Sequence, residues 1–525
     1  MNKQLITAFI MSVTAANVLA QTTRVSVPRL VIGITIDKLR TDYMDAFAPL
    51  YGEDGFKRLL REGKLYSNAQ YPMASVDRAS SVASLFTGTV PYNHGIVAEE
   101  WMDRPTMRPM YCVNDFRCVG VETSDCSSPK NLQVSTIGDE LKVATDGKAM
   151  VYAIAPNREM AVLSAGHVAD WALWIDDNTG QWAGTTYYGA TPSWVKYLSS
   201  TSVSHKISSL TWKPANDAIG KYNYYFACDK KSFSHTFTGD KRYRKFKNSA
   251  LVNEEVTNAV RSCLRNGYVG SDDITDMVSV CYYAGTFGDK PISECAAELQ
   301  DTYARLDAEI AALLNEIDKT VGLTNTLIFV TSTGYDDTPE NIGLEKYRIP
   351  TGDFEINRCA ALLNIYLMAI YGQGQYVESY FGHELYLNHK LIEEKQLNLA
   401  EILERCEDFL FQFSGVRDVY TSRRLTQGAW TPGINRIRNS YNPKCSGDIF
   451  IQVAPGWNLV NEDNATSRMQ RDSYLEFPLI FFGCGIQPEI VQQPVTVDCI
   501  APTVAHFMRI RAPNACSTAP LFLSY

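Results

Sequence analysis

The 525-residue sequence has few of the side chains that bind zinc through nitrogen or sulfur. It contains seven histidines, and no two of its thirteen cysteines have the CxxC spacing. Because cysteine-ligated zinc sites are usually built from such close pairs, a site of this kind is not expected.

Other absences exclude further classes of protein. No apolar run reaches the roughly 18 residues that a helix needs to cross a bilayer, so no transmembrane segment is expected. Basic residues are in the minority, at 49 against 58 acidic residues. The resulting net charge of -9 argues against nucleic-acid binding, which depends on a basic surface.

The N-terminus has the pattern of a secretory signal. Lys3 precedes an apolar run from Leu5 to Val18, and Ala20 supplies the small residue before the expected cleavage point. We therefore expect residues 1–20 to be a signal peptide and the mature protein, residues 21–525, to be periplasmic or secreted.

Export changes how the cysteines are interpreted. In an oxidising compartment the clustered Cys112, Cys118 and Cys126 are disulfide candidates, and their connectivity stays open. The remaining cysteines that lie in apolar runs are expected to be small core residues: Cys281, Cys406 and Cys499.

The mature chain alternates apolar runs with helical patterns. It opens with a nearly continuous apolar run at residues 29–36, which is typical of a strand buried on both faces of a parallel sheet. Apolar residues between Ile292 and Asp318 recur at steps of three and four, which predicts a long amphipathic helix. Five further runs resemble the first: 149–155, 277–283, 326–331, 449–453 and 478–482. The alternation predicts an α/β fold with a doubly wound, mostly parallel sheet flanked by helices.

Two regions interrupt this alternation, at about residues 171–247 and 357–439, and we expect them to be cap insertions on a single domain. The first is rich in aromatic residues. These form either the core of the cap or a contact surface for an unidentified protein or glycan partner, and core packing is the commoner role. The tryptophans concerned are Trp171, Trp174, Trp182 and Trp194.

The residues that follow the strands are where a ligand site is expected in such a sheet. Asp37 follows the first run, and residues 71–96 contain Thr87-Gly88 and His94-Gly95-Ile96. This layout resembles the alkaline phosphatase superfamily. Within it, the sequence is similar to the type I phosphodiesterase/nucleotide pyrophosphatase branch and the related threonine-nucleophile alkaline phosphatases. Further similar stretches extend the resemblance over nearly the whole mature chain: 136–141, 165–167, 301–307, 386–392, 441–448 and 482–486.

The resemblance implies the alkaline-phosphatase-like fold and a chemistry based on two zinc ions. One ion activates a nucleophilic hydroxyl, and both stabilise the attacking and leaving oxygens at phosphorus. The ligands would be an Asp after the first strand, a Thr or Ser nucleophile, an Asp with a His four residues later, an adjacent Asp-His pair and a late His.

This sequence departs from that ligand set. Asp37 is retained, but the nucleophile position holds Arg78, whose guanidinium has no lone pair with which to attack phosphorus. The Asp-His pair is replaced by Thr333-Gly334, and the late His by Glu476. Asp37 is therefore the only metal ligand that the resemblance assigns directly.

Four carboxylates could rebuild a metal site with zinc or with a hard cation such as magnesium or calcium. They are Asp289, Asp336, Asp337 and Glu476. If they do not converge, no cofactor is expected.

The family's substrate-binding groups are altered as well. The position of an Asn that holds phosphoryl oxygens is taken by Glu99 or Glu100, and of a Lys-x-Arg pair only Arg158 remains. Arg78 and Arg158 are thus the candidate anion-binding residues. An alternative for Arg78 is an ion pair with Asp37, which would put a side-chain cation in place of the metal ions.

These departures predict an exported pseudoenzyme, a non-catalytic binding or scaffold protein that has lost two-zinc phosphoester hydrolysis. The alternative is a phosphate or sulfate ester hydrolase, a phosphatase or phosphodiesterase, with rearranged metal ligands. A third possibility is a metal-free hydrolase with Ser80, Ser81 or Ser84 as nucleophile. That possibility lacks a neighbouring base and a GxSxG elbow.

Overall fold

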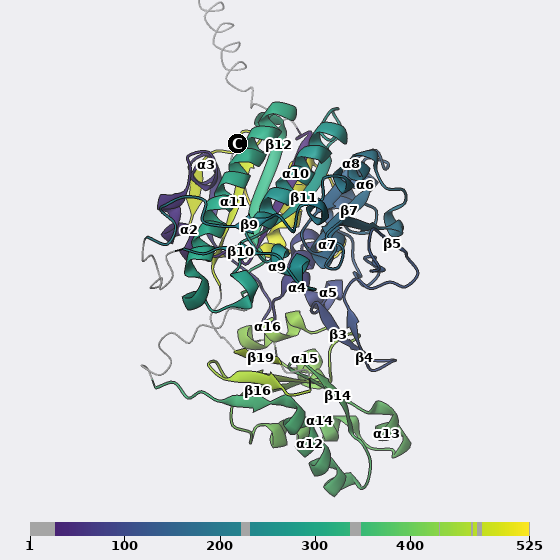
Figure 1. The fold of residues 1–525 in the computed structure, drawn as a ribbon. Coiled ribbons are helices and arrows are strands. Elements are labelled where there is room, and N and C mark those ends of the chain that lie inside the picture. The colour runs from purple at the N-terminus through teal and green to yellow at the C-terminus, as the bar shows by residue number, and fades with distance from the viewer. Residues whose placement is uncertain are drawn as a thin grey trace, which may run out of the picture.

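A computed structural model describes residues 27–221, 232–336, 348–429, 431–463, 466–469 and 475–523. The predicted signal peptide lies outside the described residues. Figure 1 shows two bodies: a large α/β body and, below it, a smaller body formed mainly by the green segments. Within the described ranges, no helix is both long and apolar enough to cross a membrane.

The large body is built on one mixed sheet whose centre is parallel. Its strands run in the order β21-β2-β20-β12-β1-β11-β6-β7-β8-β5, and β22 also pairs with β2. The five central strands from β12 to β7 are parallel to one another, whereas β20 and β8 are antiparallel to their neighbours. The bounds are β1 Leu30–Asp37, β2 Lys64–Gln70, β5 Gly120–Val121, β6 Val151–Ile154, β7 Trp171–Ile175, β8 Trp182–Thr185, β11 Asp276–Tyr283, β12 Thr326–Ser332, β20 Phe477–Gly483, β21 Glu489–Val491 and β22 Val495–Thr496.

Helices cover both faces of this sheet and bury its central strands on both sides. Every residue of β1 is buried: Ile32, Ile34 and Ile36 pack with one set of helices, whereas Val31 packs with the other. The first set comprises α2 Thr41–Ala46, α3 Phe56–Glu62, α8 Ser193–Ser199, α9 Arg242–Lys247, α10 Leu251–Asn266 and α11 Ile292–Thr320. The second comprises α4 Arg78–Thr87, α6 Ile137–Ala144, α7 Arg158–Ala165 and α17 Ile500–Met508. The predicted doubly wound, mostly parallel α/β fold is confirmed.

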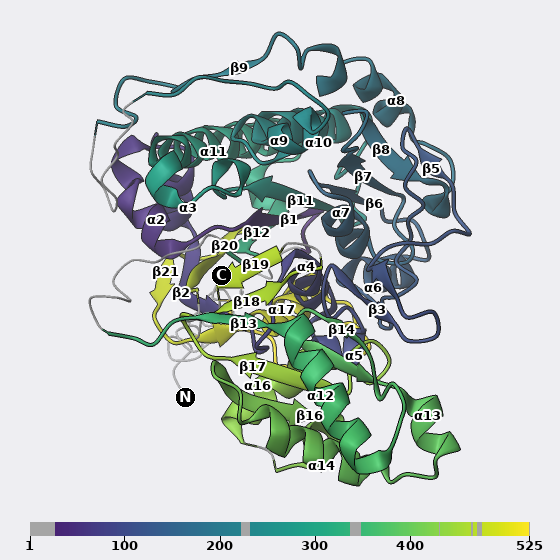
Figure 2. The same ribbon diagram turned by 60° about the horizontal axis from the view of Figure 1, so that its bottom comes forward.

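The first predicted insertion begins too early. Strand β7, which starts at Trp171, pairs in parallel with β6, and β8 then pairs with β7, so both strands extend the main sheet. The segment that follows, with β9 Thr211–Trp212 and β10 His235–Thr236, lies over α10 and α11 (Figure 2). The indole N–H of Trp212 donates to Asp301 of α11 over 2.6 Å and helps to hold the segment there.

The aromatic residues of this region belong to the core. Trp171, Trp174, Trp182 and Trp194 are all buried, so the interpretation as packing residues is confirmed for these four. Every described cysteine is a free thiol, and Cys112 is fully buried, whereas Cys118 and Cys126 are partly exposed.

The small body has a sheet of its own, in the order β14-β15-β17-β16. The apolar run at 449–453 forms β17 of this sheet, so its assignment to the main sheet was wrong. Helices α12 and α14 pack on it, and β13, β18 and β19 form a separate small sheet. The bounds are β13 Asp353–Glu355, α12 Ile356–Tyr371, β14 Val377–Phe381, β15 Glu384–Leu387, α13 His389–Glu394, α14 Leu399–Leu410, β16 Val416–Thr421, α15 Ser422–Gln427, α16 Pro432–Ser440, β17 Ile449–Val453, β18 Asn458–Asn461 and β19 Thr466–Met469.

A hairpin of the large body reaches toward the small one. It consists of β3 Glu100–Asp103 and β4 Arg108–Tyr111 and follows the short helix α5 Pro91–His94. At its turn, Arg104 donates to the Ser446 carbonyl over 2.6 Å and to the Asp448 carboxylate over 3.3 Å. The hairpin therefore forms one of the contacts that hold the two bodies together.

Candidate active site

A cleft of about 930 Å³ lies between the two bodies. Its floor comes from residues that follow sheet strands, including Arg158 after β6 and Tyr335 after β12, and from Arg78 at the start of α4. Its other wall comes from the small body, with Phe381 and Tyr441 among the lining residues. This is the carboxyl edge of the parallel strands, where ligands bind in open α/β sheets.

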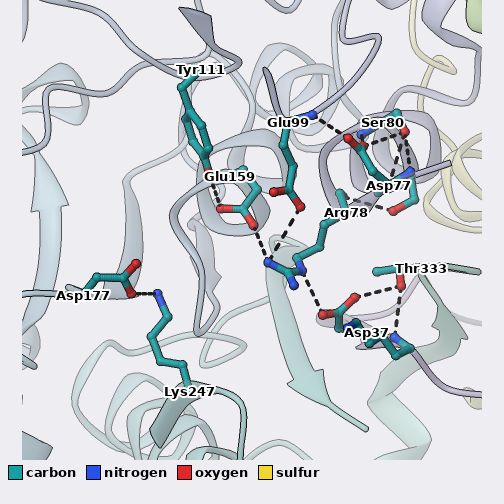
Figure 3. Close-up of polar contacts among 12 residues, drawn as sticks. Asp37, Asp77, Arg78, Ser80, Glu99, Tyr111, Glu159, Asp177, Lys247 and Thr333 are labelled. Atoms are coloured by element: carbon teal, nitrogen blue, oxygen red, sulfur yellow. Dashed lines mark hydrogen bonds and ion pairs between the residues drawn. The ribbon is translucent and has the colours of Figure 1, made fainter. Parts of the chain in front are cut away.

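Arg78 and Asp37 form an ion pair at the bottom of this cleft (Figure 3). The Arg78 Nε group donates to Asp37 Oδ2 over 2.9 Å, and the Asp37 side chain is only 2% exposed. The pair predicted as an alternative for Arg78 is thereby confirmed. Both groups are largely removed from water, so each charge is stabilised by the other rather than by solvation.

Two further carboxylates surround the same guanidinium. Arg78 Nη1 lies 3.3 Å from Glu159 Oε1 and 3.7 Å from Glu99 Oε1. Burial opposes the charge of Arg78, but Asp37, Glu99 and Glu159 together raise the pKa of its guanidinium well above its ordinary value. Arg78 is a permanent cation held by three acidic side chains, as Figure 3 shows.

The carboxyl group of Glu99 has a raised pKa. Burial raises its pKa to about 8; Arg78 opposes this shift, and the nearby Glu159, Asp77 and Asp37 add to it. Its side chain is 33% exposed and lines the cleft. Glu99 is therefore largely protonated at neutral pH and can donate a proton into the cleft.

Glu159 is fixed by a hydroxyl as well as by Arg78. The Tyr111 hydroxyl donates to Glu159 Oε2 over 2.6 Å, and the Tyr111 ring lies 4.3 Å from the guanidinium of Arg158. Arg158 also approaches Asp125 at 3.5 Å and Ser127 at 3.4 Å. Both candidate anion-binding arginines thus line one cleft, and their binding of an anion stays a prediction.

The start of α4 is held by a capping box, which explains why Arg78 points into the cleft. Asp77 accepts from the Ser80 backbone N–H over 2.8 Å, and Ser80 Oγ accepts from the Asp77 N–H over 3.0 Å. The second oxygen of Asp77 accepts from the Glu99 N–H. One cap residue thus positions both Arg78 and Glu99.

The serines of α4 are structural rather than nucleophilic. Ser80, Ser81 and Ser84 are completely buried, and each hydroxyl bonds within its own helix or cap. His94 lies 3.0 Å from Ser84, but its Nδ1 accepts from the Ile96 N–H, so the proton is on Nε2 and is donated to Ser84 Oγ. This histidine cannot serve as a base for Ser84.

Of the four carboxylates considered for a rebuilt metal site, the structure describes the side chains of Asp336 and Glu476. Asp336 has a side chain that is 5% exposed and pairs with Arg40 at 3.0 Å. Glu476 is exposed, Asp289 ends the short helix Phe287–Asp289, and Asp337 lies outside the described residues. The rearranged site stays a prediction that the described residues do not support.

The two-zinc site implied by the resemblance does not fit the side chains present. Among the described residues, no group of three or more His, Cys, Asp or Glu side chains is placed to hold a metal ion. Asp37 has both oxygens engaged, since Oδ1 accepts from the Thr333 hydroxyl over 3.0 Å and Oδ2 accepts from Arg78. No step through a zinc pair can be derived from this donor set.

Sequence reasoning placed Asp37, Arg78 and Arg158 but missed most of their partners. Glu99 was noted only as a replaced Asn, and Glu159 and Tyr111 were not considered. One signal was available for Glu159, because it directly follows Arg158 at the start of a helix after a strand. No local pattern marks Tyr111, because it reaches the site from a hairpin.

The mostly parallel sheet flanked by helices, the acidic residue that ends the first strand and the cleft at the carboxyl edge agree with an alkaline-phosphatase-like protein. The chain belongs to the type I phosphodiesterase/nucleotide pyrophosphatase family, whose model matches residues 31–474.

Relatives of this chain include two proteins named as phosphatases. Alkaline phosphatase PafA of Elizabethkingia meningoseptica is 27% identical over 95% of both chains. Alkaline phosphatase PhoV of Synechococcus elongatus is 28% identical over 93% of this chain and 91% of its own length. The crystal structure of wild-type PafA matches with a TM-score of 0.81 at 26% identity, covering 94% of this chain and 98% of that one.

These relatives overturn the prediction of a non-catalytic binding or scaffold protein. They align over more than nine tenths of this chain and carry the names of alkaline phosphatases, so the alternative of an ester hydrolase fits them better. The prediction was wrong because it treated the loss of zinc ligands as the loss of hydrolysis.

Proposed function

We propose that this chain is an exported phosphoric ester hydrolase whose cleft binds the anionic group of the ester through arginine side chains. The observation that carries the proposal is the arrangement of Arg78 and Arg158 along one cleft, beside the protonated Glu99. The names of the relatives support phosphoester hydrolysis as the reaction class.

The geometry around Arg78 leaves one donor for an anion. Its Nε and Nη1 groups contact Asp37, Glu159 and Glu99, whereas its Nη2 group has no hydrogen-bond partner in the part of the chain that the structure describes. A guanidinium binds phosphoryl and sulfuryl oxygens by charge-assisted hydrogen bonds. Arg158, which lies on the Tyr111 ring, would supply a second cation.

Glu99 would assist the departure of the alcohol. In hydrolysis, water forms a new bond to phosphorus while the bond from phosphorus to the alcohol oxygen breaks, and that oxygen takes up a proton. A carboxylic acid that keeps its proton at neutral pH is suited to supply it. The attacking water loses a proton to the solvent, and Glu99 regains one from the solvent that reaches its partly exposed side chain.

The test is turnover by the purified mature chain. We expect release of phosphate from chromogenic monoesters or diesters in the presence of a chelator, with a loss of about 100-fold in kcat/KM for Arg78→Met or Glu99→Gln, a typical effect of removing one charged or acid–base group. A sulfate ester is the comparison substrate. Arg405→Met is the matched control, because Arg405 pairs with Glu401 on the surface of α14.

Absence of turnover for every ester, with and without added zinc, magnesium or calcium, would contradict the proposal. Turnover of the sulfate ester alone would move the substrate class from phosphate to sulfate. Turnover that is unchanged in Arg78→Met would show that the anion binds elsewhere.

A further inference from the structure

The strand ends that carry the family's zinc ligands are filled in this chain by its own side chains. Two side chains bond to Asp37 in a way that a metal ion would disturb: Arg78 at the start of α4 and Thr333 after β12. Gly334, which follows Thr333, and Lys38, which follows Asp37, lie where side chains fill the space around this site.

Thr333 replaces the acidic member of the Asp-His pair. Its hydroxyl donates to Asp37 Oδ1 over 3.0 Å and accepts from the Lys38 backbone N–H over 3.1 Å. Two carboxylates at this distance would repel each other unless a cation lay between them, whereas a hydroxyl can donate. The substitution of Thr for Asp therefore removes both a ligand and the need for a metal ion.

Gly334 stands where the family has the histidine of that pair, and the space for a side chain is taken. A Cβ atom at Gly334 would lie 2.6 Å from the Tyr71 ring and 2.8 Å from the Phe477 ring, and its φ of 63° is strained for other residues. Tyr71 is fixed there because its hydroxyl donates to the Ser332 carbonyl over 2.9 Å. An imidazole could not be accommodated without moving these rings.

The end of β11 is filled in a similar way. The resemblance places an Asp and a His after this strand, but a Cβ at Gly285 would lie 2.6 Å from the Lys38 side chain. Lys38 is itself 3% exposed, so a lysine stem occupies the space next to this segment.

We propose that Arg78 is a built-in cation that takes the place of the family's divalent metal ions, so that this protein is metal-independent in both folding and ligand binding. Asp37 and Glu159 find their counter-charge in the guanidinium, and Thr333 satisfies the remaining oxygen of Asp37. A divalent ion on Asp37 would have to displace a permanent cation that already lies 2.9 Å away. This inference concerns the metal content of the protein and can hold whether or not an ester is turned over.

The first test uses the unmodified mature protein. It is purified without chelator after expression with added zinc, its metal content is measured by plasma mass spectrometry, and its melting temperature is measured with EDTA and with excess zinc, magnesium or calcium. We expect far less than one metal ion per chain and no change in melting temperature. One or two bound ions per chain, with a melting temperature that falls when EDTA removes them, would overturn the proposal.

The second test addresses Arg78 itself. Arg78→Met should lower the melting temperature because it leaves Asp37 and Glu159 without their cation, and Arg78→Lys should restore part of the loss. In Asp37→Asn with Arg78→Met the two losses should be less than additive, which is the sign of a direct interaction. Additive losses, or an unchanged melting temperature in Arg78→Met, would contradict the role of Arg78; if that variant does not fold, Arg78→Lys and the metal content still decide.

The outcome is separable from the proposed function. A metal-free protein without turnover would leave this inference standing and contradict the hydrolase. A metal-containing protein with turnover would contradict this inference and support the hydrolase.

Discussion

At the scale of single residues, the cleft is controlled by one guanidinium and the acids around it. Three carboxylates near one cation give an excess of negative charge, and a proton on Glu99 relieves it. Burial raises the pKa of Glu99 to about 8, and the negative charges of Glu159, Asp77 and Asp37 add to this shift, whereas Asp37 makes the direct ion pair with Arg78 at 2.9 Å.

The raised pKa of Glu99 makes stability depend on pH. Its pKa is about 8 in the folded protein against 4.5 for a free glutamate, so between these values the folded state binds more protons than the unfolded state. The free energy of unfolding should therefore fall as the pH rises from about 5 to about 8. Glu99→Gln cannot titrate, so its melting temperature should change less over this window.

The measurement is thermal unfolding of both proteins at several pH values. The difference in melting temperature between Glu99→Gln and the unmodified protein should grow in favour of the variant as the pH rises. Parallel curves would show that Glu99 does not hold this proton. Glu140→Gln is a control, because Glu140 lies on α6 and bonds to Ser135 outside the cleft.

At the scale of secondary-structure elements, helix α4 determines the position of the Arg78 guanidinium, because the helix begins at this residue. Its N-cap, Asp77, bonds to the Ser80 N–H and to the Glu99 N–H, so a single side chain sets the start of the helix and the position of the following loop. The helix ends at Gly88, whose φ of 63° is the left-handed conformation that glycine adopts most easily.

Removing this cap should affect both stability and the cleft. Asp77→Ala should lower the free energy of unfolding by about 1 to 2 kcal/mol, the upper part of the usual range for an N-cap, because two backbone donors lose their acceptor. Asp77→Asn keeps an acceptor oxygen and should lose less. Urea unfolding of the three proteins measures the effect, and equal losses in both variants would show that the negative charge matters more than the hydrogen bonds.

At the scale of the whole molecule, the cleft exists because two bodies meet across it. Arg104 in the β3–β4 hairpin contacts the Ser446 carbonyl and Asp448 of the small body. Asp448 also accepts from the Leu387 N–H and from His389, whose pKa is raised by that hydrogen bond. This network couples the outer wall of the cleft to the large body.

Loss of Arg104 should loosen the small body without unfolding the large sheet. In Arg104→Met we expect faster hydrogen exchange in residues 377–387 and 445–453, with unchanged exchange in β1 and β11. Exchange measured by mass spectrometry on peptides tests this, with Arg405→Met as the surface control. Faster exchange throughout the chain would indicate global destabilisation rather than loosening of the small body.

The sequence was sufficient to predict the main sheet, but it did not determine which sheet every strand joins. The runs that became β1, β11 and β12 are mostly apolar, as expected of strands buried on both faces, and every residue of the three strands is buried. The run at 449–453 has a similar composition yet forms β17 of the small body, because an apolar run does not specify which sheet it joins. The start of the first insertion was misplaced at β7 for the same reason: pairing with β6 depends on distant residues.

For the site, the resemblance assigned Asp37 and Arg78 to two positions of one metal site, and their ion pair was one of two interpretations of Arg78 that the sequence left open. Amino-acid order thus determined the fold and, through the resemblance, the exchange of a nucleophile for a cation. The structure decided that Arg78 pairs with Asp37. Only the tertiary structure decided that Glu99, Glu159 and Tyr111 share that cation and that aromatic rings fill the space beside Gly334. These contacts join segments far apart in sequence, and burial in a common cleft, which no local pattern encodes, sets their charges and protonation.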